Sequence, residues 1–267
     1  MTAARAPLDE PALRAGILGG PVWQSVEVVA ETGSTNSDLI ARAARGPVAG
    51  AVLIAEHQTA GRGRQGRSWS AARYAQITMS VAIDASAVPT DAWGWLPLAT
   101  GVAIVDTVTD LGVDAGLKWP NDVLAGGGKL AGILAEVAAE QRAVVVGIGL
   151  NVSLTGDEVG VAGVTSLVGL GVRAPDRQRL IIALLSELGR RVAAWRSAGG
   201  ADPELIADYR ARSLTLGMGV RAILPGEREI VGVARNVDNQ GRLLIDSDGQ
   251  MTTVAAGDIV HLRPADR

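Results

Sequence analysis

The 267-residue sequence predicts an α+β protein in which a mixed β-sheet packed with helices precedes a small β-barrel. Strand-like and helix-like apolar patterns alternate as far as Leu216. Beyond Leu216 the chain changes to short strands separated by turns such as DNQG and SDGQ, which are typical of hairpins. We therefore expect a loose tail with a short helix over residues 1–24, a main domain over 25–216 and a β domain over 217–267.

The elements of the main domain follow from hydrophobic period and from the residues that end each run. A helix begins at a cap formed by Ser34 or Thr35. Two strand-like runs meet at the glycines 126–128, which predicts a hairpin. The other predicted strands are VEVVAET, 51–56, 76–83 and 142–152, and the other predicted helices are 11–18, 93–111, 177–197 and 202–212.

Composition excludes several classes of protein. The sequence has no cysteine, so it forms no disulfide and no cysteine-ligated metal site. Its first residues include Asp9 and Glu10 where a signal peptide needs an apolar run, and no long uncharged apolar stretch follows, so we expect a soluble, cytoplasmic protein without a membrane segment. The net charge of −3 argues against DNA as a partner.

The distribution of lysine is unusual. Lysine and arginine total 25 residues, yet only Lys118 and Lys129 are lysines. Chance retention of two lysines would explain this without any function. Alternatively, both positions require a compact point charge that the wide guanidinium of arginine cannot replace.

The loop GRGRQGRSW, from Gly61 to Trp69, contains glycines in the G-x-G-x-x-G spacing of dinucleotide-binding loops. The sequence after it is too short and too polar for the helix that such a site requires. Glycine permits close approach of the backbone to a ligand, and arginine provides paired donors for carboxylate or phosphate. The loop therefore predicts an anion clamp between two strands, with a ligand-free basic loop as the alternative.

A second constellation spans Lys118 to Lys129. Trp119-Pro120-Asn121-Asp122 predicts a rigid turn, which is the simplest interpretation of these four residues. A turn does not require Lys118, Asp122 and Lys129 together. One carboxylate and two ammonium groups near an anion clamp suit the chemistry of a magnesium-bound nucleotide.

Five motifs occur in an order that resembles the biotin protein ligases, which attach biotin to carboxylase carrier domains. They are TGSTN (32–36), AEHQTAGRGRQGRSW (55–69), KWPND (118–122), GKLAGILAE (128–136) and GIGLNV (147–152). The resemblance covers nearly all of residues 27–264, and implies that the β domain is the SH3-like module that follows the catalytic domain of these enzymes.

The resemblance implies a two-step reaction with biotin and ATP as substrates and Mg²⁺ as the cation. Biotin attacks the α-phosphate of ATP to give biotinyl-5′-AMP, and a lysine of a biotin carboxyl carrier domain of an acyl-CoA carboxylase then displaces AMP. The implied catalytic residues are Lys129, Arg62, Arg64 and Asp122, with Asp122 also the candidate metal ligand. The implied biotin-binding residues are Ser34, Thr35, Asn36, Gln58, Gly61, Arg62, Gly63, Arg64, Lys129 and Gly132. The implied ATP- or adenylate-binding residues are Arg64, Arg67, Trp69, Lys118, Asn121, Lys129 and Asn151.

The sequence departs from some relatives of that family in two ways. About 25 residues precede the first predicted strand, too few for the DNA-binding domain that makes some members repressors. Residues 153–169 contain no tryptophan to stack on adenine, which leaves Val161, Val164 and Trp69 as candidates. A monomer or a weak homodimer is expected. The alternatives are a lipoate-type ligase or transferase of the same fold, a biotin-sensing protein without catalysis, and a nucleic-acid-binding protein.

Overall fold

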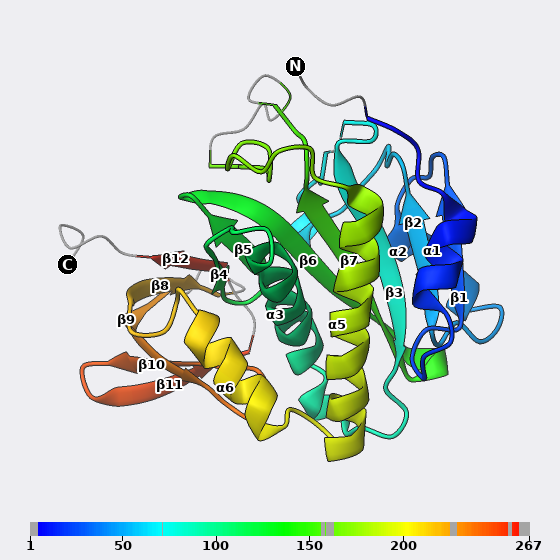
Figure 1. Ribbon diagram of the computed structural model, residues 1–267. Coiled ribbons are helices and arrows are strands. Elements are labelled where there is room, and N and C mark those ends of the chain that lie inside the picture. The colour runs from blue at the N-terminus through cyan, green and yellow to red at the C-terminus, as the bar shows by residue number, and fades with distance from the viewer. Residues whose placement is uncertain are drawn as a thin grey trace.

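Two β-sheets form the framework of the computed structural model, and helices cover both faces of the larger sheet (Figure 1). The structure describes residues 5–70, 72–155, 158, 163–224, 229–255 and 258–261. The larger sheet lies in the main domain and the smaller sheet in the C-terminal part, so the predicted α+β class is confirmed.

The larger sheet has seven strands in the order β1-β2-β3-β7-β6-β5-β4. The pair β1–β2 is parallel and the other neighbouring pairs are antiparallel, which makes the sheet mixed as predicted. The strands are β1 (Ser25–Val29), β2 (Ala51–Ala55), β3 (Gln76–Asp84), β4 (Ala115–Lys118), β5 (Asp122–Ala125), β6 (Gly128–Ala138) and β7 (Ala143–Asn151).

The KWPND segment differs from the sequence prediction. The sequence predicts one strand before the glycine hairpin, whereas the structure has two, β4 and β5, with the corner between them. Lys118 and Asp122 are directly opposite each other in the β4–β5 register, and the Trp119–Pro120 peptide is cis. Each of these strands has four residues, which is too short for a periodic pattern to separate them.

The principal helices match the predicted ranges to within about two residues at each end. They are α2 (Thr35–Ala43), α3 (Trp95–Thr109), α5 (Arg177–Ala198) and α6 (Pro203–Arg212). Ser34 caps α2, since its hydroxyl accepts from the Ser37 amide. Asp176 and Asp202 cap α5 and α6 in the same way. Within the described ranges, none of the helices combines the length and apolarity needed to traverse a bilayer.

Alternation along β7 assigns the two faces of the sheet. Val144 and Val146 belong to the large apolar cluster that also contains residues of α3 and α5. Val145, between them, packs with Leu39 and Ala43 of α2. Because successive side chains of a strand point to opposite faces, Gly147 and Gly149 lie on the α2 face. That face is covered only in part, which leaves room for a site beside the N-terminus of α2.

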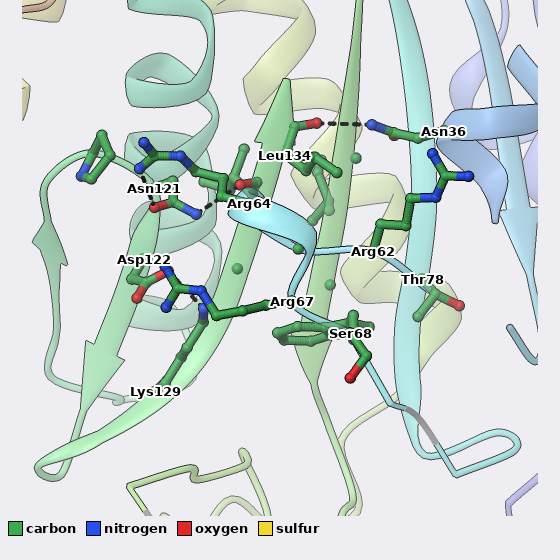
Figure 2. Close-up of a pocket in the computed structure, with 18 of the residues that line it drawn as sticks. Asn36, Arg62, Arg64, Arg67, Ser68, Thr78, Asn121, Asp122, Lys129 and Leu134 are labelled. Carbon is green, nitrogen blue, oxygen red and sulfur yellow. Dashed lines mark hydrogen bonds and ion pairs between the residues drawn. The ribbon is translucent and has the colours of Figure 1, made fainter. Parts of the chain in front are cut away.

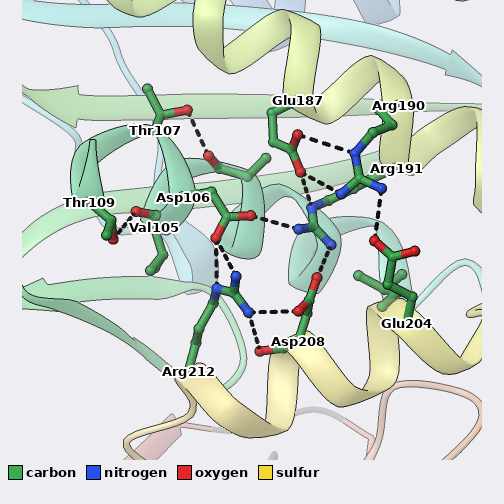
Figure 3. Close-up of polar contacts among 12 residues, drawn as sticks. Val105, Asp106, Thr107, Thr109, Glu187, Arg190, Arg191, Glu204, Asp208 and Arg212 are labelled. Carbon is green, nitrogen blue, oxygen red and sulfur yellow. Dashed lines mark hydrogen bonds and ion pairs between the residues drawn. The ribbon is translucent and has the colours of Figure 1, made fainter. Parts of the chain in front are cut away.

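A buried ionic network joins α3, α5 and α6 (Figure 3). The Arg191 guanidinium is 4% exposed and pairs with Glu187, Asp106 and Asp208 at 2.8, 2.6 and 2.9 Å. Arg212 pairs with Asp106 at 2.7 Å and with Asp208 at 2.9 Å. The network fixes the position of α6, which leads directly into the C-terminal sheet.

The expected loose N-terminal tail is instead attached to the main domain. Helix α1 (Glu10–Ile17) buries Leu13 completely against the large apolar cluster. Ahead of it, Arg5 pairs with Glu158 at 2.6 Å, and Arg177 donates a hydrogen bond to the Ala6 carbonyl at 2.7 Å. These contacts are not visible in the sequence because the partners are more than 150 residues apart.

The C-terminal sheet has five antiparallel strands in the order β11-β10-β9-β8-β12. The strands are β8 (Gly219–Ile223), β9 (Glu229–Val237), β10 (Leu243–Ser247), β11 (Gln250–Val254) and β12 (Asp258–His261). Two tryptophans anchor this sheet to the main domain: Trp119 donates from its indole to the Gly241 carbonyl at 3.0 Å, and Trp95 donates to Asp238 at 3.1 Å.

Candidate active site

A cavity of about 350 Å³ opens on the α2 face of the large sheet (Figure 2). Residues from many separate segments of the chain line it, including the KWPND corner and the C-terminal sheet. The lining residues used below are Ser34, Thr35, Asn36, Gln58, Arg62, Gly63, Arg64, Arg67, Trp69, Lys118, Asn121, Asp122, Lys129, Gly132, Gly147, Gly149, Ile223 and Ile259.

The floor of the cavity is built from glycines on adjacent strands. Gly132 of β6 and Gly149 of β7 are directly paired in register. A Cβ atom on Gly149 would clash with the Trp69 indole, and one on Gly132 would lie 3.0 Å from both the Trp69 ring and Lys129 Cε. The missing side chains therefore provide the space that Trp69 and Lys129 occupy above the sheet.

Lys129 and Asp122 form an ion pair on this floor. Lys129 Nζ lies 2.7 Å from Asp122 Oδ1 and 5.6 Å from the centre of the Trp69 ring. Lys118 lies opposite Asp122 in the β4–β5 register. The only two lysines of the sequence therefore both belong to strands next to the same carboxylate, Lys129 as its ion-pair partner and Lys118 opposite it in register.

The GRGRQGRSW segment forms a short antiparallel turn above the floor. The Gly63 amide donates to the Arg67 carbonyl at 2.6 Å, and the Trp69 amide donates to the Gly61 carbonyl at 2.8 Å. Arg64 donates from its guanidinium to Asn121 Oδ1 at 3.2 Å, which joins the loop to the KWPND corner. In Figure 2, Arg67 points toward Asp122 and Lys129, while Arg62 lies on the side of Asn36.

A chain of hydrogen bonds lies at the opposite end of the cavity, around Thr35 and Asn36. Gln58 Oε1 accepts from the Thr35 amide at 2.8 Å and from the Thr35 hydroxyl at 3.0 Å. Ser80 is 2.6 Å from the Thr35 hydroxyl and donates to Asn36 Oδ1 at 2.6 Å. Asn36 then donates to Glu136 at 2.8 Å. These polar groups are held in fixed orientations by each other.

Most of the residues expected from the sequence are brought together here, and two are not. Gly61 does not line the cavity; it packs against the Trp69 backbone, where a Cβ would clash with the Trp69 carbonyl oxygen. Asn151 is 1% exposed, and its amide donates to the carbonyls of Lys129 and Thr165 at 3.2 and 2.9 Å. Asn151 thus supports the Lys129 strand from beneath instead of facing the cavity.

The candidates for an adenine contact have different positions. Trp69 lines the cavity, with its indole donating to Gln76 at 3.1 Å. Val164 makes a backbone bridge to Lys129. Val161 lies outside the described residues.

Sequence reasoning missed two residues that hold lining side chains in place and two residues that line the cavity. Ser80 and Glu136 lie inside apolar strand patterns, where a polar residue gives no sign of its partner. Ile223 and Ile259 come from the C-terminal sheet, which is more than 70 residues further along the chain than the last expected site residue. The alternating glycines of GIGLNV were a usable signal, because glycine within a strand marks close approach by another group.

The charge of the cavity favours anions. Five cationic side chains line it, from Arg62, Arg64, Arg67, Lys118 and Lys129, and Asp122 is the only acidic side chain among the described lining residues. Over the described ranges, no three histidine or acidic side chains converge as a metal centre would require. The arrangement can bring two anionic reactants together over a single ammonium group.

Comparison with known proteins first defines the class. Residues 32–153 match the biotin/lipoate A/B protein ligase family, and residues 215–262 match the biotin protein ligase C-terminal domain. A biotin protein ligase from Aquifex aeolicus, solved in complex with biotin and ATP, superposes with a TM-score of 0.76 at 24% identity. The superposition covers 90% of this chain and 100% of that chain.

The narrower assignment comes from sequence relatives. The biotin–[acetyl-CoA-carboxylase] ligase of Mycobacterium tuberculosis is 56% identical over 265 residues, which covers 97% of each chain. The bifunctional ligase/repressor BirA of Escherichia coli is 32% identical, covering 94% of this chain and 78% of its own length. The chain therefore belongs to the biotin protein ligase family, and it is a ligase enzyme.

Proposed function

We propose that this enzyme joins biotin to ATP as biotinyl-5′-AMP and transfers the biotinyl group to a lysine of a biotin carrier domain of acetyl-CoA carboxylase. The observation that carries the proposal is the Lys129–Asp122 pair on the floor of a cavity whose other charged lining groups are all cations. The 56% identical relative is a biotin–[acetyl-CoA-carboxylase] ligase, which supports the choice of biotin and of the carrier.

The first step brings a carboxylate to a phosphate. A carboxylate oxygen of biotin attacks the α-phosphorus, the bond to the β-phosphate oxygen breaks, and pyrophosphate leaves. Both reactants are negative, so the barrier includes their repulsion. Lys129 is a point charge at the floor, and the loop residues Arg62, Arg64 and Arg67 supply donors from above; such preorganised cations lower the barrier most where the negative charge accumulates.

The end of the cavity around Thr35 and Asn36 is suited to the ureido ring of biotin. That ring offers one carbonyl acceptor and two N–H donors. Ser34, Thr35, Asn36 and Gln58 lie at this end, where Ser80 and Glu136 fix the orientations of Thr35 and Asn36. A fixed polar set binds such a ring without further ordering cost. With the ring bound at this end, the biotin carboxylate would extend toward Lys129.

The second step needs a neutral amine and a protected anhydride. The lysine amine of the carrier attacks the biotinyl carbonyl carbon, an amide bond forms, and AMP leaves. Asp122 is the acidic side chain available to orient the incoming ammonium and to take its proton. The arginine loop covers the site in the meantime and keeps water from the anhydride.

Asp122 also fits a magnesium ion carried by ATP. Mg²⁺ is usually held by one or two carboxylates together with substrate phosphates, and Asp122 is the carboxylate on the cavity floor, near the lysines. When bound, the ion would neutralise phosphate charge. Lys118, just before the corner, and Asn121, within it, line the same cavity and are the candidates for contacts with the phosphates.

The experiment uses radiolabelled biotin, ATP and a purified carrier domain with its acceptor lysine. We expect label on the wild-type carrier and biotin-dependent release of pyrophosphate. We expect no label on a carrier whose acceptor lysine is replaced by arginine. Binding of biotin without release of pyrophosphate and without labelled carrier would show that the protein only binds biotin. Transfer of lipoyl groups in place of biotin would identify the lipoate-type alternative.

A further inference from the structure

The C-terminal sheet reaches the active-site corner through two hydrogen bonds in series. Thr215 is fully buried, and its hydroxyl oxygen accepts from the Trp119 amide at 3.0 Å. The same oxygen lies 3.0 Å from Nε2 of His261, the last described residue of β12. Trp119 directly follows Lys118, so this chain of contacts ends at the peptide that positions a cavity lysine.

The protonation states are consistent along this chain. A threonine hydroxyl that accepts from the Trp119 amide still has its own proton to donate, and an unprotonated Nε2 can accept it. Burial, and then the nearby Lys118 ammonium, lower the pKa of His261. Both effects favour the neutral ring that the hydrogen bond requires.

Neighbouring contacts show that this connection spans the two sheets. The Leu214 amide donates to the Leu117 carbonyl at 2.8 Å, so residues 213–215 run beside the β4 edge. Ile259, two residues before His261 and on the same face of β12, lines the cavity itself. One strand of the C-terminal sheet thus contributes a wall residue and a support residue to the same site.

We propose that His261 and Thr215 are positioning residues of the ligase reaction, which hold the Lys118–Asp122 corner in place from the C-terminal sheet. Neither residue touches the reactants; they act through the Trp119 backbone. The inference rests on the proposed function only because the ligase reaction is used to measure the effect of these residues. If it holds, the C-terminal sheet is part of the active-site framework for both half-reactions, because both use groups of the same corner.

The test compares paired substitutions in the full chain. Thr215→Val removes the hydroxyl at nearly constant volume, and Thr215→Ser keeps it. His261→Leu removes the acceptor, and His261→Gln keeps an acceptor at the position of Nε2. Thr107→Val is the matched control, because Thr107 is also a buried threonine, and its hydroxyl bonds the Ala103 carbonyl within α3, away from the corner.

Three results are expected. Thr215→Val and His261→Leu each lower kcat of pyrophosphate release and of transfer by about three- to tenfold, with little change in KM for biotin. A loss of this size corresponds to the free energy of about one hydrogen bond expressed as a change in rate. Thr215→Ser, His261→Gln and Thr107→Val remain near wild type. The double variant Thr215→Val with His261→Leu loses no more than the stronger single variant, because both break one chain of contacts.

Amide hydrogen exchange at Trp119 provides a readout that does not depend on activity. Faster exchange in Thr215→Val and His261→Leu, with an unchanged melting temperature, is the expected result. Wild-type kcat in both variants, or independent multiplicative losses in the double variant, would overturn the inference. If the wild type makes no biotinyl-AMP, the proposed function fails, while unchanged Trp119 exchange in the variants would refute the positioning role separately.

Discussion

Lys129 Nζ and Asp122 Oδ1 are 2.7 Å apart, and the two residues belong to adjacent strands of one hairpin. The pair defines the point at which carboxylate and phosphate are expected to meet. Its position is set by the β5–β6 register and by the absence of a side chain at Gly132, whose place the Lys129 side chain and the Trp69 ring fill.

Replacing Lys129 by arginine tests whether a point charge is required. We expect Lys129→Arg to fold normally and to lower the rate of pyrophosphate release by about a hundredfold, because the broader guanidinium displaces the charge by about an ångström. Transfer from synthetic biotinyl-AMP should fall less, since that substrate has already passed the step in which two anions meet. Normal pyrophosphate release would remove Lys129 from the mechanism.

Alanine at Gly149 tests the glycine floor. Its Cβ would clash with the Trp69 indole, so Gly149→Ala should shift Trp69 and lower adenylate formation by about a hundredfold while the sheet remains folded. Gly46→Ala serves as the control, because no atom lies within 4 Å of the added Cβ there. Equal activities of the two variants would show that Trp69 does not need its position over Gly149.

The ionic network of α3, α5 and α6 predicts a difference between neighbouring arginines. Arg191→Met leaves three partly buried carboxylates without their shared cation and should lower the free energy of unfolding by about 3 kcal/mol. Arg190→Met removes two ion pairs, with Glu187 and Glu204, whose arginine is 50% exposed, and should cost less than about 1 kcal/mol. Urea denaturation measures the free energy of unfolding of both variants. Similar losses in the two variants would contradict the conclusion that burial makes the ion pairs of Arg191 more important for stability than those of Arg190.

Limited proteolysis tests closure of the arginine loop. Arg62 and Arg67 are exposed, and trypsin should cleave after them more slowly when biotin and ATP are both present. Cleavage after Arg173, an exposed residue that does not line the cavity, provides the internal control. Protection at Arg173 to the same extent would indicate general inhibition of trypsin rather than closure over a ligand.

The contact between Arg5 and Glu158 predicts a dependence on pH. Hydrogen bonding by the Arg5 guanidinium, and then by the Thr155 amide, lowers the pKa of Glu158 from 4.5 to about 2. Because the folded-state pKa is lowered, the stability from this carboxylate is fully present above about pH 4.5 and is lost as the pH falls toward 2. NMR titration should find the pKa of Glu158 raised in Arg5→Ala, and an unchanged value would show that Arg5 is not its cause.

Local sequence patterns were sufficient for most of the fold and for the charged half of the site. The strand at 142–152 and the helix at 177–197 have strong periodic patterns, and the structure confirms both. The KWPND hairpin was missed because four-residue strands carry no measurable period. Ser80, Ile259 and Thr215 were missed for a different reason: each acts through a partner that only the tertiary fold brings near.

The placement of both lysines inside the cavity has a consequence for the rest of the molecular surface. An enzyme that releases an activated acyl group exposes its own amines to self-labelling. Arginine remains protonated and does not become acylated under these conditions, and 23 of the 25 basic residues are arginine. Lys118 and Lys129 are the only lysine side chains the sequence could offer, and Lys129 is paired with Asp122. If biotinyl-5′-AMP forms as proposed, no lysine of the enzyme outside the cavity competes for it with the carrier lysine.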